Sequence, residues 1–559
     1  MKRGWSGGKY WFVILGTAAL AWASTPLAAA PPVRQVSEQI DRTIDAALKQ
    51  QGIEPAPRAE EVELHRRLYL DLLGRIPTPE ELQSFLEDKS DAKVEALIER
   101  LLVHEEMPLH WRRVIDRWLN ESLLERPAGG DEFLDWLAAE LARNRGWDAL
   151  ARDLLLPPLE PAESRAASYF LASRLSGGDR QEQLDRVTSA VASGLFGVQL
   201  QCAKCHDHPY VVEWQQDHYY GLTAFLGRTQ TAKIENATVL SEKAEGEVTF
   251  VTNSKQERTA KLLFLDGHVI EEPAPPEDRN KWYSKGEKGA PDAPYFSRRQ
   301  ALVEYAIAPE RPAFKRSIAN RVWRELMGRG LVEPVDQIHS ENKASHPELL
   351  ELLAEDSAAS GFDLRRLMAA ILHSRAYQRS SRWVSEERPP AENYTTAIIK
   401  PLSPHQLAVS LAQATGQLDA LSAKLEREKE KRKLDRVDTF AVRAAFERER
   451  DYGSFLERFR NEGSEFQANA SQALFLTYNN ATQAMLRPNP GSLTARMVET
   501  NNAGEAARLA WLSVLSREPS AEELELAGAA LGDTEKLDPT LCGDLVWALF
   551  TSAEFRFNH

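Results

Sequence analysis

The sequence predicts a mainly α-helical protein, with two helical domains joined by a small β-containing insert. Through most of the chain, apolar residues recur at spacings of three and four, as on the buried face of a helix. Several of these stretches follow a residue pattern that is typical of a helix start. Between residues 231 and 296, short β-branched and aromatic runs lie instead among proline, glycine and charged residues, which indicates short strands.

The first thirty residues are typical of an export signal. Lys2, Arg3 and Lys9 form a positive region, and residues 10–23 are apolar and uncharged. This stretch is short for a membrane span, and no later stretch is long and apolar enough for one. We therefore expect residues 1–30 to be a signal peptide, the protein to be periplasmic or secreted, and no membrane span to remain after cleavage.

The charge of the chain argues against one class of partner. There are 83 acidic and 69 basic residues, which gives a net charge of −14. No basic stripe interrupts this balance, so we expect no binding to nucleic acid. An acidic surface suits an exported protein that must remain soluble.

The first helical domain is expected over residues 34–230. Apolar residues at helical spacing between residues 33 and 48 predict its first helix. Thr78-Pro79-Glu80-Glu81 predicts a helix start, because the threonine can cap, the proline fits the first turn and Glu81 completes a capping box. Residues 184–202 again carry an apolar stripe, which predicts a further helix.

An insert over residues 231–296 and a second helical domain over residues 297–559 follow. Within the insert, Asp266-Gly267 lies between two short apolar runs, which is typical of a β-hairpin. In the second domain, Ser345-His346-Pro347-Glu348 and Ser520-Ala521-Glu522-Glu523 predict helix starts.

A weak internal repeat links the two ends of the chain. Residues 70–82 match residues 512–524, and each copy reads as an apolar helix, an Arg-x-Pro turn and a capped second helix. Residues 101–107 and 549–555 end the two copies in a similar way, and residues 371–377 form a partial third copy. We interpret the repeat as a reused helical hairpin that supports packing and not catalysis.

The chemistry of the sequence is concentrated in one pentapeptide, Cys202-Ala203-Lys204-Cys205-His206, the only Cys-x-x-Cys-His in the chain. This motif is typical of covalent haem c attachment, in which both cysteines bond to the haem and His206 binds the iron. Export agrees with this use, because bacteria attach haem c outside the cytoplasm. If the preceding helix continues through the motif, the sulfur atoms of Cys202 and Cys205 face its buried side.

The same segment has other possible uses. Cys202, Cys205, His206 and His208 could bind zinc or iron, with ligands from elsewhere because four such close residues would be cramped. In an oxidising compartment, Cys202 and Cys205 could instead form a disulfide that locks a turn. We interpret the remaining cysteine, Cys542, as a buried apolar residue.

A second ligand for a haem iron is not marked by the sequence. His208 is too close to His206 for the two imidazoles to reach opposite faces of one ring. His218 is sterically more plausible. Other candidates in the same domain are His65, His104, Met107 and His110.

With these motifs in place, the chain resembles a known pair of domains. It is similar to the paired domains of unknown function in large exported proteins of planctomycetes, of which the first is named as cytochrome-like. The first domain is marked by residues 66–81 and 197–209, and its partner by residues 320–323, 328–332 and 345–350. The resemblance implies export and a c-type cytochrome-like motif, with no established reaction.

The resemblance also bears on individual residues. The family usually has an acidic residue where this chain has His218, so a family-wide role of that histidine as iron ligand loses support. In the partner domain, Asn320, Arg321, Trp323 and His346 could line a site, or could serve only packing and helix capping.

We therefore predict an exported c-type haem protein that transfers electrons to or from a redox partner protein. One alternative is an exported scaffold or carbohydrate-associated protein whose motif is a disulfide or a structural metal site. The other is a metal-dependent enzyme, although the sequence shows no catalytic triad, phosphate loop or glycosidase carboxylate pair by spacing.

Overall fold

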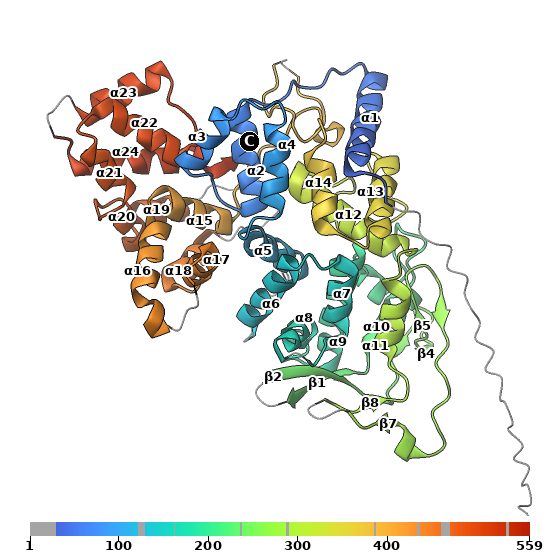
Figure 1. Cartoon of the computed structure of the whole chain (residues 1–559). Helices are drawn as coiled ribbons and strands as arrows, with labels where there is room; N and C mark the ends of the chain where they lie inside the picture. Colours follow the sequence, from blue (N-terminus) through green and yellow to red (C-terminus); the bar gives the residue numbers. More distant parts are fainter. Residues whose placement is uncertain are drawn as a thin grey trace, which may run out of the picture.

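The computed structural model describes residues 30–120, 129–160, 162–234, 237–286, 290–384, 387–432, 436–459, 470–532 and 536–559. In this part of the chain helices dominate, and strands occur only as short antiparallel pairs (Figure 1). The predicted fold class, mainly α with a small β-containing insert, is confirmed. Except for Ala30, the predicted signal peptide lies outside the described residues. Among the described residues, no helix combines the length and apolar character needed to cross a membrane.

The first part of the chain is helical up to residue 226. Its elements are α1 (Val33–Gln51), α2 (Glu61–Leu73), α3 (Pro79–Glu87), α4 (Lys93–Leu102), α5 (Met107–Asn120), α6 (Gly130–Ala142), α7 (Trp147–Leu155), η1 (Ala162–Ser168), α8 (Tyr169–Ala172), α9 (Arg180–Phe196), η2 (Gln201–Lys204) and α10 (Gln216–Leu226). The predicted capping box begins α3: Glu81 N donates to Thr78 Oγ1 at 3.2 Å, and Thr78 N donates to Glu81 Oε2 at 2.7 Å.

Short strands follow α10. They are β1 (Thr229–Ile234), β2 (Ala237–Glu242), β3 (Thr249–Val251), β4 (Glu257–Thr259), β5 (Leu262–Leu263), β6 (Val269–Ile270), β7 (Tyr283–Ser284) and β8 (Ala293–Pro294), with η3 (Arg279–Lys281) before β7. Each odd-numbered strand pairs with the next. The predicted hairpin at Asp266-Gly267 joins β5 and β6, and Gly267 takes the positive φ of +85° that such a turn requires.

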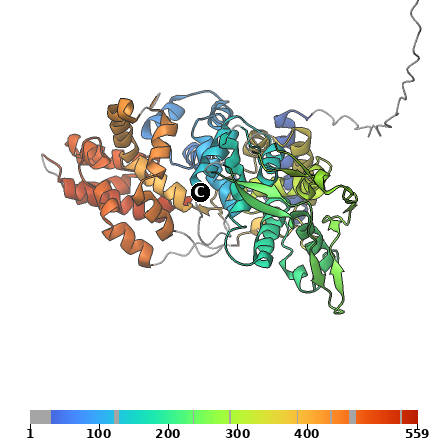
Figure 2. The same cartoon turned by 90° about the horizontal axis from the view of Figure 1, so that it is seen from below.

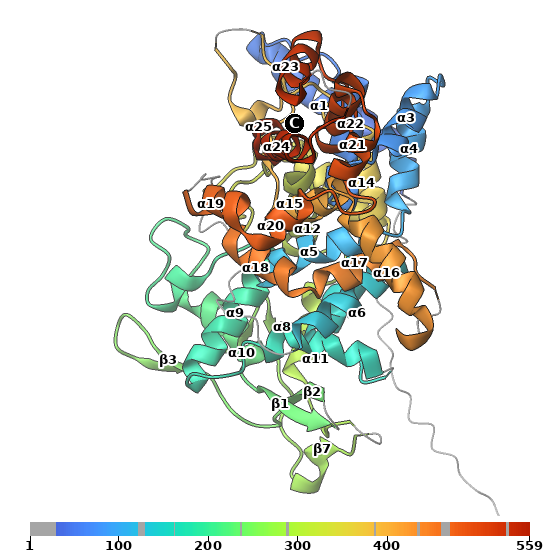
Figure 3. The same ribbon diagram turned by 90° about the vertical axis from the view of Figure 1, so that its left-hand side faces the viewer.

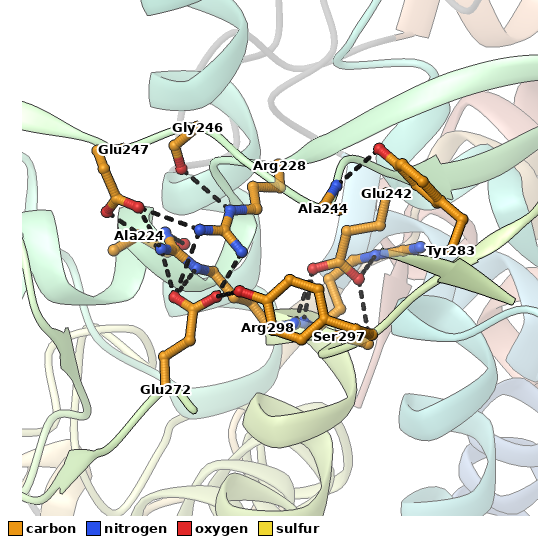
Figure 4. Close-up of polar contacts among 12 residues, drawn as sticks. Ala224, Arg228, Glu242, Ala244, Gly246, Glu247, Glu272, Tyr283, Ser297 and Arg298 are labelled. Atoms are coloured by element: carbon orange, nitrogen blue, oxygen red, sulfur yellow. Dashed lines mark hydrogen bonds and ion pairs between the residues drawn. The ribbon is translucent and has the colours of Figure 1, made fainter. Parts of the chain in front are cut away.

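A polar cluster fastens this β segment to the helices around it (Figure 4). Arg228 after α10 and Arg298 at the start of the next helix are both buried. Glu272 accepts from both guanidinium groups, at 2.5 Å from Arg228 and 2.6 Å from Arg298, and Glu247 accepts from both at 3.1 and 3.0 Å. Glu242 accepts from Arg298 N at 2.8 Å. The segment is therefore cross-linked to the helical body by paired charges, and the cluster is satisfied internally.

Helices again form the rest of the chain. They are α11 (Arg298–Ala306), α12 (Pro312–Met327), α13 (Pro347–Ala359), α14 (Leu364–Leu372), η4 (Ala391–Asn393), α15 (Pro404–Ala414), α16 (Gln417–Arg432), α17 (Thr439–Glu447), α18 (Arg450–Phe459), α19 (Ala470–Tyr478), α20 (Asn480–Met485), α21 (Leu493–Glu499), α22 (Ala503–Val514), α23 (Ala521–Leu531), α24 (Pro539–Thr551) and α25 (Ala553–Arg556). Strands β9 (Lys400–Pro401) and β10 (Phe557–Asn558) pair with each other. The predicted helix starts at residues 345–348 and 520–523 are those of α13 and α23.

Buried apolar side chains form two clusters that divide the chain near residue 400. The first runs from Val36 to Tyr394 and includes α11 to α14. The second comprises α15 to α25 together with Leu70 and Ile76. The orange and red helices of the second cluster lie at one end of the molecule (Figure 2), and strands β1, β2 and β7 lie at the opposite end from α22 to α24 (Figure 3). Packing thus joins α11–α14 to the first part of the chain.

The internal repeat is a pair of helical units closed by equivalent arginines. Arg75 contacts the capping glutamate Glu81 at 2.8 Å and Glu106, at the end of the repeat, at 2.8 Å. In the second copy, Arg517 contacts Glu523 at 2.7 Å and a glutamate aligned with Glu106, Glu554, at 2.6 Å. The repeated residues therefore close a packing unit, in agreement with the sequence interpretation.

The equivalent arginine–glutamate ion pairs of the two repeat copies differ in burial. Side chains of the first pair, Arg75 and Glu106, are 5% and 2% exposed, whereas Arg517 and Glu554 are each 30% exposed. Glu106 also accepts from Arg443 of α17 at 2.5 Å, and that arginine is fully buried. The pair of Arg75 and Glu106 is thus linked to the second apolar cluster, because Arg443 lies on α17, whose apolar residues belong to that cluster.

We expect Glu106→Gln to lower the free energy of unfolding by about 3–5 kcal/mol, because it leaves the buried guanidinium group of Arg443 without a carboxylate and removes one of the two carboxylates that contact Arg75. The matched control is Glu554→Gln in the second copy, where solvent screens the pair and the expected loss is under about 1 kcal/mol. Chemical denaturation followed by circular dichroism measures both. Equal losses in the two variants would contradict the assignment of Glu106 as the link between clusters.

The same carboxylate gives the protein an acid-sensitive component of stability. Burial alone would raise the pKa of Glu106, but Arg75 and Arg443 outweigh it and lower this pKa from 4.5 to about 2. Its contribution is therefore complete above pH 4.5 and is lost as the pH falls towards 2. We expect the unfolding free energy of the Glu106→Gln variant to fall less steeply than that of the wild type across this range. Parallel slopes in denaturation series at stepped pH would refute this.

Candidate functional site

The Cys-x-x-Cys-His motif lies directly after α9, in a separate turn. Gly197 ends α9 with a φ of +66°, and Val198 N donates back to Ala192 O at 3.1 Å, which closes the helix. A side chain here would also meet Ile338 Cδ1 at 2.9 Å. The condition on which a buried orientation of the cysteines depended, a helix that continues through the motif, is therefore not met, because a left-handed glycine stops α9.

The motif cysteines face solvent. Residues 201–204 form the short 3₁₀ helix η2, in which side chains three residues apart eclipse one another. Cys202 and Cys205 are both free and exposed, whereas Ala203 between them is fully buried. The expectation that both sulfur atoms face the buried side is wrong, because Ala203 takes the inward position. Both thiols are therefore accessible to solvent.

Polar contacts hold this turn on α9 and α10. Lys204 forms an ion pair with Asp185 of α9, and the hydrogen bond raises the pKa of Lys204. Tyr219 OH donates to the same carboxylate at 2.6 Å. Tyr220 OH and Gln216 Nε2 donate to the carbonyl oxygen of Lys204 at 3.2 and 3.3 Å. The backbone of the motif is thus fixed while its cysteines remain accessible.

His206 is oriented by its own neighbour. Its Nδ1 lies 2.7 Å from the carbonyl oxygen of Asp207. Because a carbonyl oxygen can only accept, Nδ1 carries the proton, and the neutral ring keeps its lone pair at Nε2. The exposed Nε2 makes no hydrogen bond to the described part of the chain. This is the tautomer and second contact that metal-binding histidines generally show.

His208 and His218 have the opposite tautomer. Nδ1 of His208 accepts from Val211 N at 2.9 Å and Tyr210 N at 3.3 Å. Nδ1 of His218 accepts from Gln215 N at 3.3 Å, as part of the capping box of α10. A neutral ring whose Nδ1 accepts carries its proton at Nε2 and has no free lone pair there. Both histidines stabilise local backbone, and neither is prepared as a ligand.

The other candidate ligands of the first domain lie among α2 to α5. His65 is buried and stacks on Phe85 with ring centroids 4.6 Å apart, and His110 is buried and stacks on His405 at 6.1 Å. His104 Nδ1 accepts from Glu106 N at 3.2 Å. Met107 is buried. Across the described residues, no group of three or more His, Cys, Asp or Glu side chains is arranged to hold a metal ion.

A distant segment packs against the motif. We name it the α12–α13 loop, residues 328–346. Ile338 N donates to Gly197 O at 2.9 Å, and Ser340 N donates to Glu213 Oε1 at 2.9 Å. Between these two contacts lies His339, which sequence reasoning missed.

The ring of His339 lies close to aromatic rings of the motif segment. Its centroid is 5.1 Å from that of Trp214 and 6.5 Å from that of His208. Burial lowers the pKa of His339. No local pattern marks this residue in the sequence, because only the fold brings it to the motif.

Exposed apolar side chains follow the motif. Tyr210 is 79% exposed and Val212 is 83% exposed. Large apolar side chains of this exposure, beside two accessible thiols, are suited to contact with a further apolar group.

Three of the four candidate residues of the partner domain, Asn320, Trp323 and His346, serve structure. Asn320 Nδ2 donates to Val332 O at 2.8 Å, and its Oδ1 accepts from Val332 N at 3.0 Å. Trp323 is buried edge-on against Tyr394. His346 is the N-cap of α13. These positions brace the α12–α13 loop.

Comparison with known families divides the chain into two matched regions. Residues 39–231 match the family model PSCyt2, described as a protein of unknown function (DUF1549), and residues 298–531 match PSD1, also of unknown function (DUF1553). The chain pairs these two domains. No curated protein and no solved structure gives a significant match.

The pairing agrees with the resemblance seen in the sequence, at the level of two domains of unknown function in this order. The Cys-x-x-Cys-His motif lies within the DUF1549 domain, and the α12–α13 loop lies within the DUF1553 domain. The contact at Gly197 and Glu213 is therefore a contact between the two matched domains.

In haem-free protein exposed to air, we expect a disulfide between Cys202 and Cys205, because both thiols are accessible and only three residues apart in the chain. Thiol titration after denaturation should then count one thiol, that of Cys542, and three after reduction. In the reduced native protein, Cys542 should react only on unfolding, since burial raises its pKa to about 11.

The variant Cys542→Ser is the control, because it removes the slow thiol alone. A metal bound in place of the disulfide would be detected by elemental analysis of the same sample. Three free thiols in air-exposed protein, with neither metal nor haem, would mean that the pentapeptide is only a turn.

Proposed function

We propose that the protein is an exported c-type haem protein that transfers electrons, with Cys202 and Cys205 attached to the haem and His206 bound to its iron. The observation that carries the proposal is the 2.7 Å contact between His206 Nδ1 and the carbonyl oxygen of Asp207, from which we infer that the lone pair of the neutral ring is at Nε2, next in sequence to two accessible cysteines. The export signal predicted at residues 1–30 and the resemblance to exported planctomycete cytochrome-like domains support it.

The surroundings of the motif fit such a group. Two accessible thiols three residues apart in one turn suit attachment at two points of one ring. The exposed Tyr210 and Val212 offer apolar surface that a macrocycle can cover. Bound haem supplies one-electron redox chemistry, whose potential depends on the axial ligands and the surroundings.

The residues of the motif would attach the haem, orient its iron ligand and hold the turn that carries both. The carbonyl oxygen of Asp207 holds the His206 ring in place and increases the basicity of Nε2. The ion pair of Lys204 with Asp185 fixes the turn from the opposite side. A ligand held by its own backbone needs little rearrangement when the charge of the iron changes.

The alternatives are supported less well. A zinc or iron site that includes His208 would require this residue to give up the two backbone hydrogen bonds at its Nδ1. A disulfide between Cys202 and Cys205 fits the exposed turn, but it assigns no role to the orientation of His206. A scaffold or a metal-dependent enzyme has no further feature of the site in its favour.

The test is expression of the full chain in a bacterial host that matures a control c-type cytochrome. We expect the purified protein to retain haem on a denaturing gel stained for peroxidase activity. The double variant Cys202→Ala/Cys205→Ala should lose the stain, because no thioether can form. His206→Ala should retain the stain with a perturbed spectrum, because it removes only the iron ligand.

Cys542→Ala is the matched control for the cysteines, since that thiol is buried and apart from the motif; it should keep the stain. Absence of the stain from the wild type, while the control cytochrome is stained, would reject the haem hypothesis. A disulfide in that protein would then favour the alternative of a locked turn.

A further inference from the structure

The α12–α13 loop is a rigid support where it meets the motif. Asn342 N donates to His339 O at 3.1 Å, and its Nδ2 donates to Gln337 O at 2.9 Å. Outside the loop, Gln199 Nε2 donates to Asp336 Oδ2 at 2.6 Å. The backbone on both sides of His339 is therefore held, partly by the loop itself and partly by the segment that precedes the cysteines.

The imidazole of His339 is uncommitted. Its Nδ1 is buried and has no hydrogen-bond partner in the described part of the chain, and its Nε2 makes no hydrogen bond there either. A buried polar atom without a partner is unfavourable and calls for an explanation. The ring contacts Trp214 edge-on, which fixes its plane without using either nitrogen.

The other histidines near the motif are already engaged. His206 provides one imidazole to the proposed iron site. His208 and His218 each use Nδ1 to accept backbone N–H groups, and their Nε2 atoms are protonated. Among these histidines, His339 therefore has both nitrogens free of hydrogen bonds, and it lies beside His208 at 6.5 Å between ring centroids.

We propose that His339 of the DUF1553 domain is the second iron ligand of the haem attached to the DUF1549 domain. This inference rests on the proposed function, because it needs haem on Cys202 and Cys205. It makes the two domains one redox centre: the first attaches the group, and the second provides its other axial ligand. The contact between the domains then has a functional reason besides packing.

The test uses the full-length, haem-loaded protein and its visible and electron paramagnetic resonance spectra. We expect the wild type to be low-spin with two imidazole ligands. His339→Ala should become high-spin, and added imidazole should restore the low-spin spectrum. His339→Met should remain low-spin with a higher reduction potential, because methionine ligation raises the potential of c-type haem.

The matched control is His208→Ala, which removes a neighbouring imidazole that is engaged with backbone; it should remain low-spin. The haem stain separates the two hypotheses. A wild type without haem overturns both, whereas a stained His339→Ala protein with an unchanged low-spin spectrum overturns the ligand assignment alone. If His339→Ala fails to fold by circular dichroism, the His339→Met variant decides, since an unchanged potential and spectrum would equally overturn the assignment.

Discussion

The structure depends on the buried charges of a single helix, α2. Arg66, Arg67 and Asp71 are all inaccessible to solvent, so each must find partners to offset the cost of desolvation. Apart from Glu63, which pairs with Arg67 within the helix, those partners are far away in the sequence: Ser516 and Phe555 for Arg66, Tyr377 and Arg379 for Arg67, and Tyr377, Lys400 and Asn558 for Asp71. Hydrogen bonds are directional, so these contacts of α2 set the orientation of the two apolar clusters relative to each other. Nonpolar packing alone would specify that orientation less strictly.

Features that depend on neighbouring residues could be predicted from the sequence. The capping box at Thr78 and the hairpin at Gly267 follow from a few adjacent residues, and both were found where expected. The end of α9 was also marked locally, since Gly197 follows the last apolar residue of the stripe. If the helix had continued past this glycine, the cysteines would lie on its buried side. The left-handed backbone of Gly197 ends α9 instead, and both cysteines are exposed to solvent.

Features that depend on distant pairs could not be predicted. Nothing near His339 indicates that it will lie against Trp214, because the contact joins two segments that only the tertiary fold brings together. The same holds for Arg228 and Arg298, whose shared glutamates attach the β segment to the helices. For the motif itself, the residues could be identified from the sequence, and the structure added the hydrogen bonds that distinguish His206 from His208.

The contacts of α2 with residues far along the chain also have a consequence for the order of folding. This helix lies near the start of the chain, yet Arg66 and Arg67 bond to the carbonyl oxygens of Phe555 and His559. Contacts of such large sequence separation form late, because the intervening loop must first be closed. During synthesis the chain therefore cannot complete these contacts of α2 until Phe555 and His559 have emerged.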